Sequence, residues 1–432
     1  MIFLNMLFPK SFRSILVALI CFLTACSENP ISNQQQNSQM RIQLNENMGM
    51  VGTAWKEMFD GQSENKKAKN LSSDLFAMDF TQDDENFAHF INSLKDIDSS
   101  NQSADFKARF KEDLAGYHKF WQSNLNTLNK KQKELQKFCD KYITDEYLDK
   151  IRKFYKSKLQ AQETDVYLVP LLDDHNAESF YIGNNMIFLQ VMPCNTVDHI
   201  GVMLHEFFHI NYDNSTMRLE MEKVFKENHA EVIHAYMNEA LAVAGGNILT
   251  KLIFEGKKEK EGFACDVINQ FGIALAPLVK SYIDNGKSLD HEFFEQSIKI
   301  FKAIFPDYQK NIKYRLIDVR IYSSDKDEKL LQQRVFDLMQ PLSASNILCA
   351  SIQSYGLNEI NLNWPESAKI ILLKNNENLK GMHIKQNEFA VRHTDDSAIQ
   401  IIIKSDDPKA LIKVIKRLLK MDIFTDLKMT IS

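Results

Sequence analysis

Apolar residues at three- and four-residue spacing indicate helices over much of this chain. They recur, with charged residues between them, over residues 44–59, 87–97 and 106–155, as in helices that bury one face. We therefore expect an N-terminal helical region over residues 41–160. Residues 251–345 have a similar spacing, and we expect the helical pattern to continue there.

Short β-rich runs interrupt the helical pattern twice before residue 195. Val166–Val169 and Met186–Val191 are rich in β-branched and aromatic residues, and turn-forming segments separate them. We expect strands here. They form either an edge strand beside a functional site or an ordinary hairpin that fills a small sheet.

The pattern changes again from about residue 346. A helix is expected from Pro408 through Leu419, because proline suits the first turn of a helix. Three strands are expected before it, at residues 368–373, 388–392 and 399–403. We therefore expect a small α/β module over residues 346–432. The fold class expected for the whole chain is mainly α with a small β-sheet (α+β).

Composition adds little beyond this fold class. The low content of 14 Gly and 9 Pro favours helices. The formal net charge of −5 gives no basic surplus, so we expect no nucleic-acid partner. In an oxidising compartment the four cysteines after residue 26 could form two disulfides with three alternative pairings, and their spacing selects none of them: Cys139, Cys194, Cys265 and Cys349.

The N-terminus has the features of an export signal. Lys10 and Arg13 precede a short apolar stretch, Ser14–Phe22, which is too short to span a bilayer. Leu23-Thr24-Ala25-Cys26 then resembles the lipobox of bacterial lipoproteins. This resemblance implies that residues 1–25 are a lipoprotein signal peptide and that Cys26 is lipidated. The alternative is a plain secretory signal in which Cys26 is incidental.

Residues 26–40 are rich in Asn, Gln and Ser, so we expect a flexible tether. A lipid anchor at Cys26 would hold the chain on a membrane surface in the bacterial cell envelope. Ser27, rather than aspartate, follows the cysteine. By resemblance to Gram-negative lipoproteins this implies the outer membrane, on its periplasmic face.

The strongest chemical signal is His205-Glu206-Phe207-Phe208-His209. Two histidines four residues apart on a helix point to the same side and can bind one zinc ion. Glu206 is placed to take a proton from a zinc-activated water. The flanking residues are almost all apolar, and burying two histidines and a glutamate there is costly unless a metal or other partners satisfy them. Asn195 with Asp198 predicts where this helix begins.

A catalytic zinc needs a third protein ligand and an open position. Several residues downstream are candidates: Asp213, Glu220, Glu222, Glu227, His229, Glu231, His234 and Glu239. We favour Glu239, because the uncharged run Ala240–Ala244 that follows it must pack inside the protein. A lone carboxylate beside such a run needs a cation nearby.

With Asn238-Glu239-Ala240 on the following helix, the motif resembles the gluzincin metallopeptidases, the thermolysin-like branch of the zincins. The resemblance covers roughly residues 165–250. It implies a zincin-like metallopeptidase core within residues 161–345, which binds zinc and acts on a peptide or protein substrate. It also implies that His205, His209 and Glu239 are the zinc ligands and that Glu206 is the general base.

Two features depart from the family pattern. The longer gap between His209 and Glu239 makes residues 211–228 an insertion. Val243 stands where the family has an aspartate that orients a zinc histidine, so another group must do this, and Asp213 and Asn247 are candidates. The donor that would stabilise an oxyanion is open among five residues: His229, His234, Tyr236, Tyr314 and Tyr322.

These observations predict a membrane-tethered zinc metallopeptidase that hydrolyses envelope proteins or peptides. Two alternatives keep the zinc fold. One is a zinc amidase that acts on cell-wall peptides, and the other is a non-catalytic binding or assembly lipoprotein.

Overall fold

The structure is a computed structural model. It describes most of the chain between Gln39 and Thr430, namely residues 39–59, 67–76, 85–159, 163–170, 179–191, 195–256, 266–309, 314, 318–323, 351–356, 368–378, 383–393, 399–407, 409–418 and 427–430. The predicted signal peptide, Cys26 and almost all of the predicted tether therefore lie outside the described residues. No described helix is both long enough and apolar enough to cross a membrane.

A four-stranded sheet lies in the N-terminal part, with the order β1-β2-β4-β3. Its strands are β1 (Met40–Gln43), β2 (Thr164–Pro170), β3 (Ser179–Ile182) and β4 (Met186–Val191). β2 and β4 are the two predicted strands, but they pair in parallel and do not form a hairpin with each other. The hairpin is β3–β4, and β3 is an antiparallel edge strand that we did not predict.

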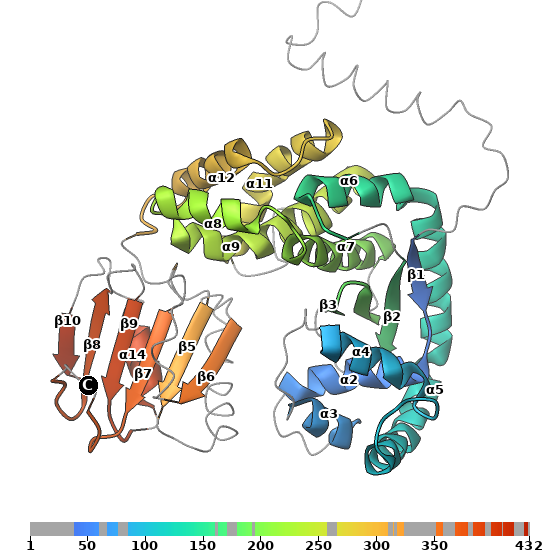
Figure 1. The fold of residues 1–432 in the computed structure, drawn as a ribbon, viewed down its shortest axis with the longest axis horizontal. Coiled ribbons are helices and arrows are strands. Elements are labelled where there is room, and N and C mark those ends of the chain that lie inside the picture. The colour runs from blue at the N-terminus through green and yellow to red at the C-terminus, as the bar shows by residue number, and fades with distance from the viewer. Residues whose placement is uncertain are drawn as a thin grey trace, which may run out of the picture. The chain divides into compact units, whose positions relative to one another are not determined.

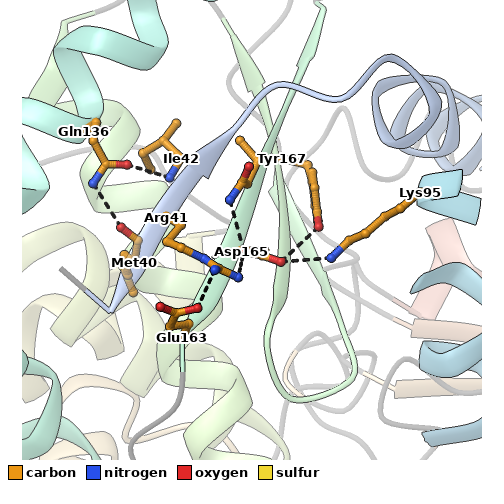
Figure 2. Close-up of polar contacts among 9 residues, drawn as sticks. Met40, Arg41, Ile42, Lys95, Gln136, Glu163, Asp165 and Tyr167 are labelled. Carbon is orange, nitrogen blue, oxygen red and sulfur yellow. Dashed lines mark hydrogen bonds and ion pairs between the residues drawn. The ribbon is translucent and has the colours of Figure 1, made fainter. Parts of the chain in front are cut away.

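β1 corrects the prediction that a tether passes directly into helices at residues 40–41. It pairs in parallel with β2, and its other edge is held by α5 (Ala104–Tyr142), as Figure 2 shows. The Gln136 amide accepts a hydrogen bond from the Ile42 amide at 2.8 Å and donates one to the Met40 carbonyl at 3.3 Å. Gln132 donates to the Ile42 carbonyl at 3.0 Å. Two side chains of α5 thus take the place of a neighbouring strand.

A buried carboxylate ties β1 and β2 to their surroundings. Asp165 accepts hydrogen bonds from Arg41 at 2.7 Å, from Lys95 at 2.9 Å and from the Tyr167 hydroxyl at 3.0 Å (Figure 2). Burial alone would raise the pKa of Asp165, but Lys95, Arg41 and Tyr167 together lower it. The carboxylate therefore stays charged in the core and holds β1 in register.

The N-terminal helices are α2 (Glu46–Phe59), α3 (Lys69–Phe76), α4 (Glu85–Ser93), the 3₁₀ turn η2 (Leu94–Asp96), α5 and α6 (Asp145–Tyr155). Of these, α2 and α5 pack against this sheet, α3 packs on α2 and α5, and α6 packs on the later helices α7 (Thr196–Asp213) and α11 (Asp266–Asp284) (Figure 1). Ser103 and Thr144 cap α5 and α6 by accepting a hydrogen bond from the backbone amide of the third residue of each helix. The predicted helical region is thus present, preceded by β1.

The following helices carry the candidate site. They are α7 (Thr196–Asp213), α8 (Arg218–Glu227), α9 (Glu231–Ala242), the π-helix η3 (Val243–Ile248), α10 (Leu249–Glu255), α11 (Asp266–Asp284) and α12 (His291–Ile304). α8 occupies the predicted insertion between the two metal-site helices. One continuous apolar core extends from Met40 to Tyr314, so these helices and the four-stranded sheet share an interior.

The C-terminal part is a six-stranded mixed sheet in the order β10-β8-β9-β7-β5-β6. Its elements are β5 (Asp318–Ser323), β6 (Ser351–Gly356), β7 (Ala368–Leu373), β8 (Glu388–His393), β9 (Ile399–Lys404), α14 (Ala410–Leu418) and β10 (Leu427–Thr430). β5 corrects the prediction of helices up to residue 345, since the sheet begins well before residue 346. α14 packs its apolar side on one face of this sheet, which has its own core.

The described chain is thus mainly helical with two small mixed sheets, as the expected fold class states. Cys139 is a free, buried thiol in α5, whereas Cys194, Cys265 and Cys349 lie outside the described residues. Burial raises the pKa of this thiol to about 12, which makes Cys139 a core residue and not a reactive one.

Candidate metal centre

α7 begins where the sequence predicts. The Asn195 side chain accepts a hydrogen bond from the Asp198 amide at 2.8 Å and so caps the helix. Almost every later side chain of α7 is buried, which explains its nearly continuous apolar sequence. His205 and His209 lie one turn apart, with their Nε2 atoms 3.0 Å from each other.

α9 brings Glu239 to the same point. Its carboxylate oxygens lie 3.6 Å from His205 Nε2 and 3.4 Å from His209 Nε2. Ala240–Ala244 are fully buried, as predicted, but the Glu239 side chain is itself 42% exposed. The cluster therefore has one side in the core and one side open to solvent, as a catalytic metal site requires.

The donor atoms fit zinc. Each of the three residues offers one ligand atom, and these atoms lie within 4.8 Å of one another. Two ligands about 2.1 Å from a tetrahedral zinc are separated by about 3.4 Å. His205 Nε2 and His209 Nε2 are 3.0 Å apart, and they lie 3.6 and 3.4 Å from different oxygens of the Glu239 carboxylate, so all three residues are within reach of one ion. Two imidazoles and a carboxylate, with a fourth side open, form the donor set of a catalytic zinc site.

Two asparagines orient the imidazoles. His205 Nδ1 donates a hydrogen bond to Asn247 Oδ1, and His209 Nδ1 donates one to Asn238 Oδ1, both at 2.8 Å. With the Nδ1 proton held in this way, each neutral ring presents Nε2 to the metal position. Asn247 was one of our two candidates for this role. The other, Asp213, instead accepts a hydrogen bond from the Tyr181 hydroxyl.

The π-helix explains why Asn247 and not residue 243 reaches His205. An α-helix advances 100° per residue, whereas a π-helix advances only roughly 80°. Four α-helical steps from Glu239 to Val243 and four π-helical steps to Asn247 therefore amount to about two full turns. Glu239 and Asn247 thus lie on the same side of the helix, both toward α7.

Two glycines allow this helix to touch α7. A Cβ atom at Gly245 would lie 1.9 Å from the Phe208 ring, and one at Gly246 would lie 2.4 Å from the backbone of His205. Any other residue would push the two helices apart. The Gly245-Gly246 pair therefore places the Asn247 amide within hydrogen-bonding reach of His205.

The cluster is strongly coupled electrostatically in the absence of metal. Burial opposes the charged form of His209, but the nearby Glu239 carboxylate outweighs it and raises the pKa of His209 to about 10. Burial would likewise raise the pKa of Glu239, but the two histidines lower it well below its ordinary value. In the metal-free site the protonated His209 ring therefore forms an ion pair with the Glu239 carboxylate and supplies the positive charge that a bound metal ion would otherwise supply.

Glu206, the predicted general base, is buried beside this cluster. Its carboxylate accepts a hydrogen bond from the Ser179 hydroxyl of β3 at 2.7 Å, and its charge also helps to raise the pKa of His209. Ser179 was not predicted, because it belongs to the unpredicted strand β3. The structure thus brings together the four residues predicted for the metal site: His205, Glu206, His209 and Glu239.

Three of the five candidate oxyanion donors, His234, Tyr236 and Tyr314, make contacts outside the cluster. The hydroxyl of Tyr236 donates to the carbonyl of Tyr314, and the hydroxyl of Tyr314 donates to Asp307. His234 packs its ring against a phenylalanine. His229 lies in a turn with φ of 48°, and Tyr322 lies in β5.

A tyrosine that the sequence did not indicate contacts the cluster instead. The Tyr181 ring, on β3, stacks on the His209 ring with their centroids 6.1 Å apart. Together with the bond from Ser179 to Glu206, this contact makes β3 one wall of the candidate metal centre.

Comparison with known proteins returned no matching family model, no matching curated protein and no matching solved structure.

Proposed function

We propose that this chain is a zinc-dependent metallopeptidase with a zincin-like core of the gluzincin kind. The observation that carries the proposal is the convergence of His205, His209 and Glu239 from two helices, with both Nδ1 atoms bound to asparagine oxygens and with Glu206 beside them. Zinc in such a site acts as a Lewis acid and lowers the pKa of a water in the open position.

In the proposed reaction Glu206 moves the protons. Its carboxylate accepts a proton from the attacking water and then delivers it to the leaving amine of the cleaved peptide bond. The Ser179 hydroxyl binds one carboxylate oxygen, which leaves the other available for this transfer. His205 and His209 keep their tautomers throughout, because Asn247 and Asn238 hold the Nδ1 protons.

The two edges of the small sheet differ in a way that favours peptide binding at β3. Gln132 and Gln136 of α5 form hydrogen bonds with backbone groups on the outer edge of β1, so another strand cannot pair with that edge. β3 pairs only with β4 among the described residues, and it contacts the metal site through Ser179 and Tyr181. An extended substrate can therefore add to β3 and pass beside the metal.

The proposal includes the location inferred from the sequence. A lipid on Cys26 would tether the peptidase to the bacterial cell envelope, and the tether would join the fold at β1. The substrates would then be envelope proteins or peptides in reach of that surface.

Hydrolysis of an unfolded protein tests the activity. The zinc-loaded chain should release peptides from denatured, fluorescently labelled casein. Glu206→Gln should bind the same amount of zinc but lose most of the rate, by a factor of about a hundred or more. Glu220→Gln, which removes an exposed carboxylate of α8, is the matched control and should keep full activity. Hydrolysis that persists in Glu206→Gln would contradict the proposal.

A further inference from the structure

An exposed aromatic cluster lies where α5 ends and α10 passes. Phe138, Tyr142 and Phe254 contact one another with ring centroids 4.8 to 5.4 Å apart. Tyr142 is 41% exposed, and the neighbouring Ile253 is 43% exposed. Only three large apolar side chains of the described residues are this exposed, and two of them lie here. We call Phe138, Tyr142, Ile253 and Phe254 the aromatic patch.

A row of lysines runs along α5 toward this patch. Lys133, Lys137 and Lys141 follow one another at four-residue spacing, so they lie on one side of the helix, and all three are exposed. The Lys141 ammonium lies 4.7 Å from the centre of the Tyr142 ring. Lys133 and Lys137 form no ion pair within the described part of the chain. We call these three residues the lysine row.

The acids on this side of α5 do not neutralise the lysine row. Glu134 is paired with Lys130 and Lys131. Asp140 accepts a hydrogen bond from Gln136 at 2.8 Å and is exposed. On α5 one carboxylate thus remains against the three lysines of the row. Glu255, next to Phe254 on α10, is a second acid, so this surface carries a net positive charge of about one next to exposed aromatic rings.

The N-terminal segment joins the fold beside the same surface. The first described residue, Gln39, donates its amide hydrogen to Asp145, just after α5, and the next residue, Met40, is bound by Gln136 of α5. On the helix, the lysine row lies between Gln136 on one side and Phe138 and Tyr142 on the other. The thirteen residue-to-residue steps from Cys26 to Gln39 span at most roughly 45 Å when extended.

We propose that the lysine row and the aromatic patch together bind the surface of an anionic phospholipid membrane. Lysine ammonium groups contact anionic headgroups, while tyrosine and neighbouring apolar side chains enter the interface between headgroups and acyl chains. The surface and the N-terminal attachment adjoin each other on α5. A lipid anchor and this surface therefore act on one membrane, and the surface adds to the binding that the anchor provides.

This inference uses the export signal of the chain but not its proposed catalysis. The test therefore measures membrane binding of metal-free protein, which is independent of any hydrolysis. The chain from Ser27 to Ser432 lacks the lipidation site and keeps every residue that the structure describes. It should co-sediment with vesicles of phosphatidylethanolamine and phosphatidylglycerol but not with vesicles of phosphatidylcholine alone.

Two sets of variants assign the binding to this surface. Lys133→Gln, Lys137→Gln and Lys141→Gln together should lower the partition coefficient about a hundredfold, at about fivefold for each lysine. The matched control carries the same charge change at exposed lysines of α8 and α12: Lys223→Gln, Lys299→Gln and Lys302→Gln. It should bind as the parent chain does.

A further variant tests the apolar part of the surface. Tyr142→Ser with Ile253→Ser should weaken vesicle binding by roughly tenfold or more, because their exposed apolar area no longer enters the interface. Unchanged thermal unfolding would show that all variants remain folded.

Three results would overturn the proposal. The first is no binding to the anionic vesicles, and the second is an equal loss in the control variant. The third is unchanged vesicle binding by the Tyr142→Ser, Ile253→Ser protein, together with sedimentation velocity that shows the parent chain as a dimer and this variant as a monomer. The aromatic patch would then be an interface between copies of this chain.

Discussion

Zinc binding should release about one proton from His209 near neutral pH. In the metal-free protein burial disfavours the charged imidazole, but the Glu239 carboxylate raises the pKa of His209 to about 10. Near pH 7.5 this ring is therefore almost fully protonated, whereas a histidine with an ordinary pKa of about 6.5 is only about one-tenth protonated. Zinc binds the neutral ring, so the proton must leave.

Calorimetric titration with zinc in buffers of equal pH and different ionisation enthalpy counts this proton. The slope of the observed enthalpy against the ionisation enthalpy of the buffer gives the protons released per zinc. Glu239→Gln removes the charge that holds the proton, so its slope should be smaller by most of one proton. A water in the open position contributes to both slopes. Equal slopes for the parent chain and Glu239→Gln would refute this account of the site.

The same shifts set how the stability of the metal-free protein depends on pH. The folded pKa of His209 lies above its unfolded value, so its stabilising contribution is complete below about pH 6.5 and is lost as the pH rises through about 10. The folded pKa of Glu239 is lowered, so its contribution is present above about pH 4.5 and is lost in acid. Urea unfolding of metal-free protein should show both losses, and zinc should remove the alkaline one.

Two substitutions test how the helices hold the site. Asn247→Ala should weaken zinc binding by about tenfold to a hundredfold in a chelator competition, because His205 loses its orienting acceptor. The control Asn211→Ala removes a buried amide of α7 that is bonded to the backbone, and it should bind zinc as the parent chain does. Equal zinc affinities in all three proteins would exclude an orienting role for Asn247. Gly246→Ala should lower the free energy of unfolding by about 1–3 kcal/mol or more, since its Cβ would overlap the backbone of α7. The control Gly116→Ala has nothing within 4 Å of its Cβ and should raise the free energy of unfolding by roughly 0.5–1 kcal/mol. A Gly246→Ala protein as stable as the parent chain would contradict the close packing of the two helices.

Local signals account for the parts of the fold that the sequence predicted. The Asn195 cap, the four-residue spacing of His205 and His209, and the apolar run after Glu239 each act within a few residues. The same is true of β2, β4 and the three strands β7, β8 and β9, whose apolar residues are mostly β-branched, aliphatic or aromatic. The cluster of the two histidines, Glu206 and Glu239 could therefore be anticipated.

Features that depend on distant partners could not be anticipated. β1 and β3 are strands of four residues, too short to show a pattern, and Met40 pairs with Thr164 far along the chain. β3 supplies Ser179 and Tyr181 to the site, so both residues were missed with it. β5 lay in a stretch whose spacing resembled a helix, and its parallel partners decide its conformation.

The π-helical turn at Val243–Ile248 has a consequence for recognising related chains. It adds about one residue to the helix without adding a turn. The number of residues between a position before the π-turn and a position after it is therefore larger by one than in an uninterrupted α-helix. A relative that lacks this turn would carry the histidine-orienting residue four or seven positions after the third ligand, where this chain has it at eight. A sequence motif that fixes this interval would therefore fail to group two chains whose side chains are arranged alike around the metal. Deleting one residue between Val243 and Asn247 would therefore convert the π-turn to α-helix and leave Asn247 on the side of α7, whereas deleting one residue from the α-helical part between Glu239 and Val243 would rotate Asn247 by about 100° and turn it away from His205.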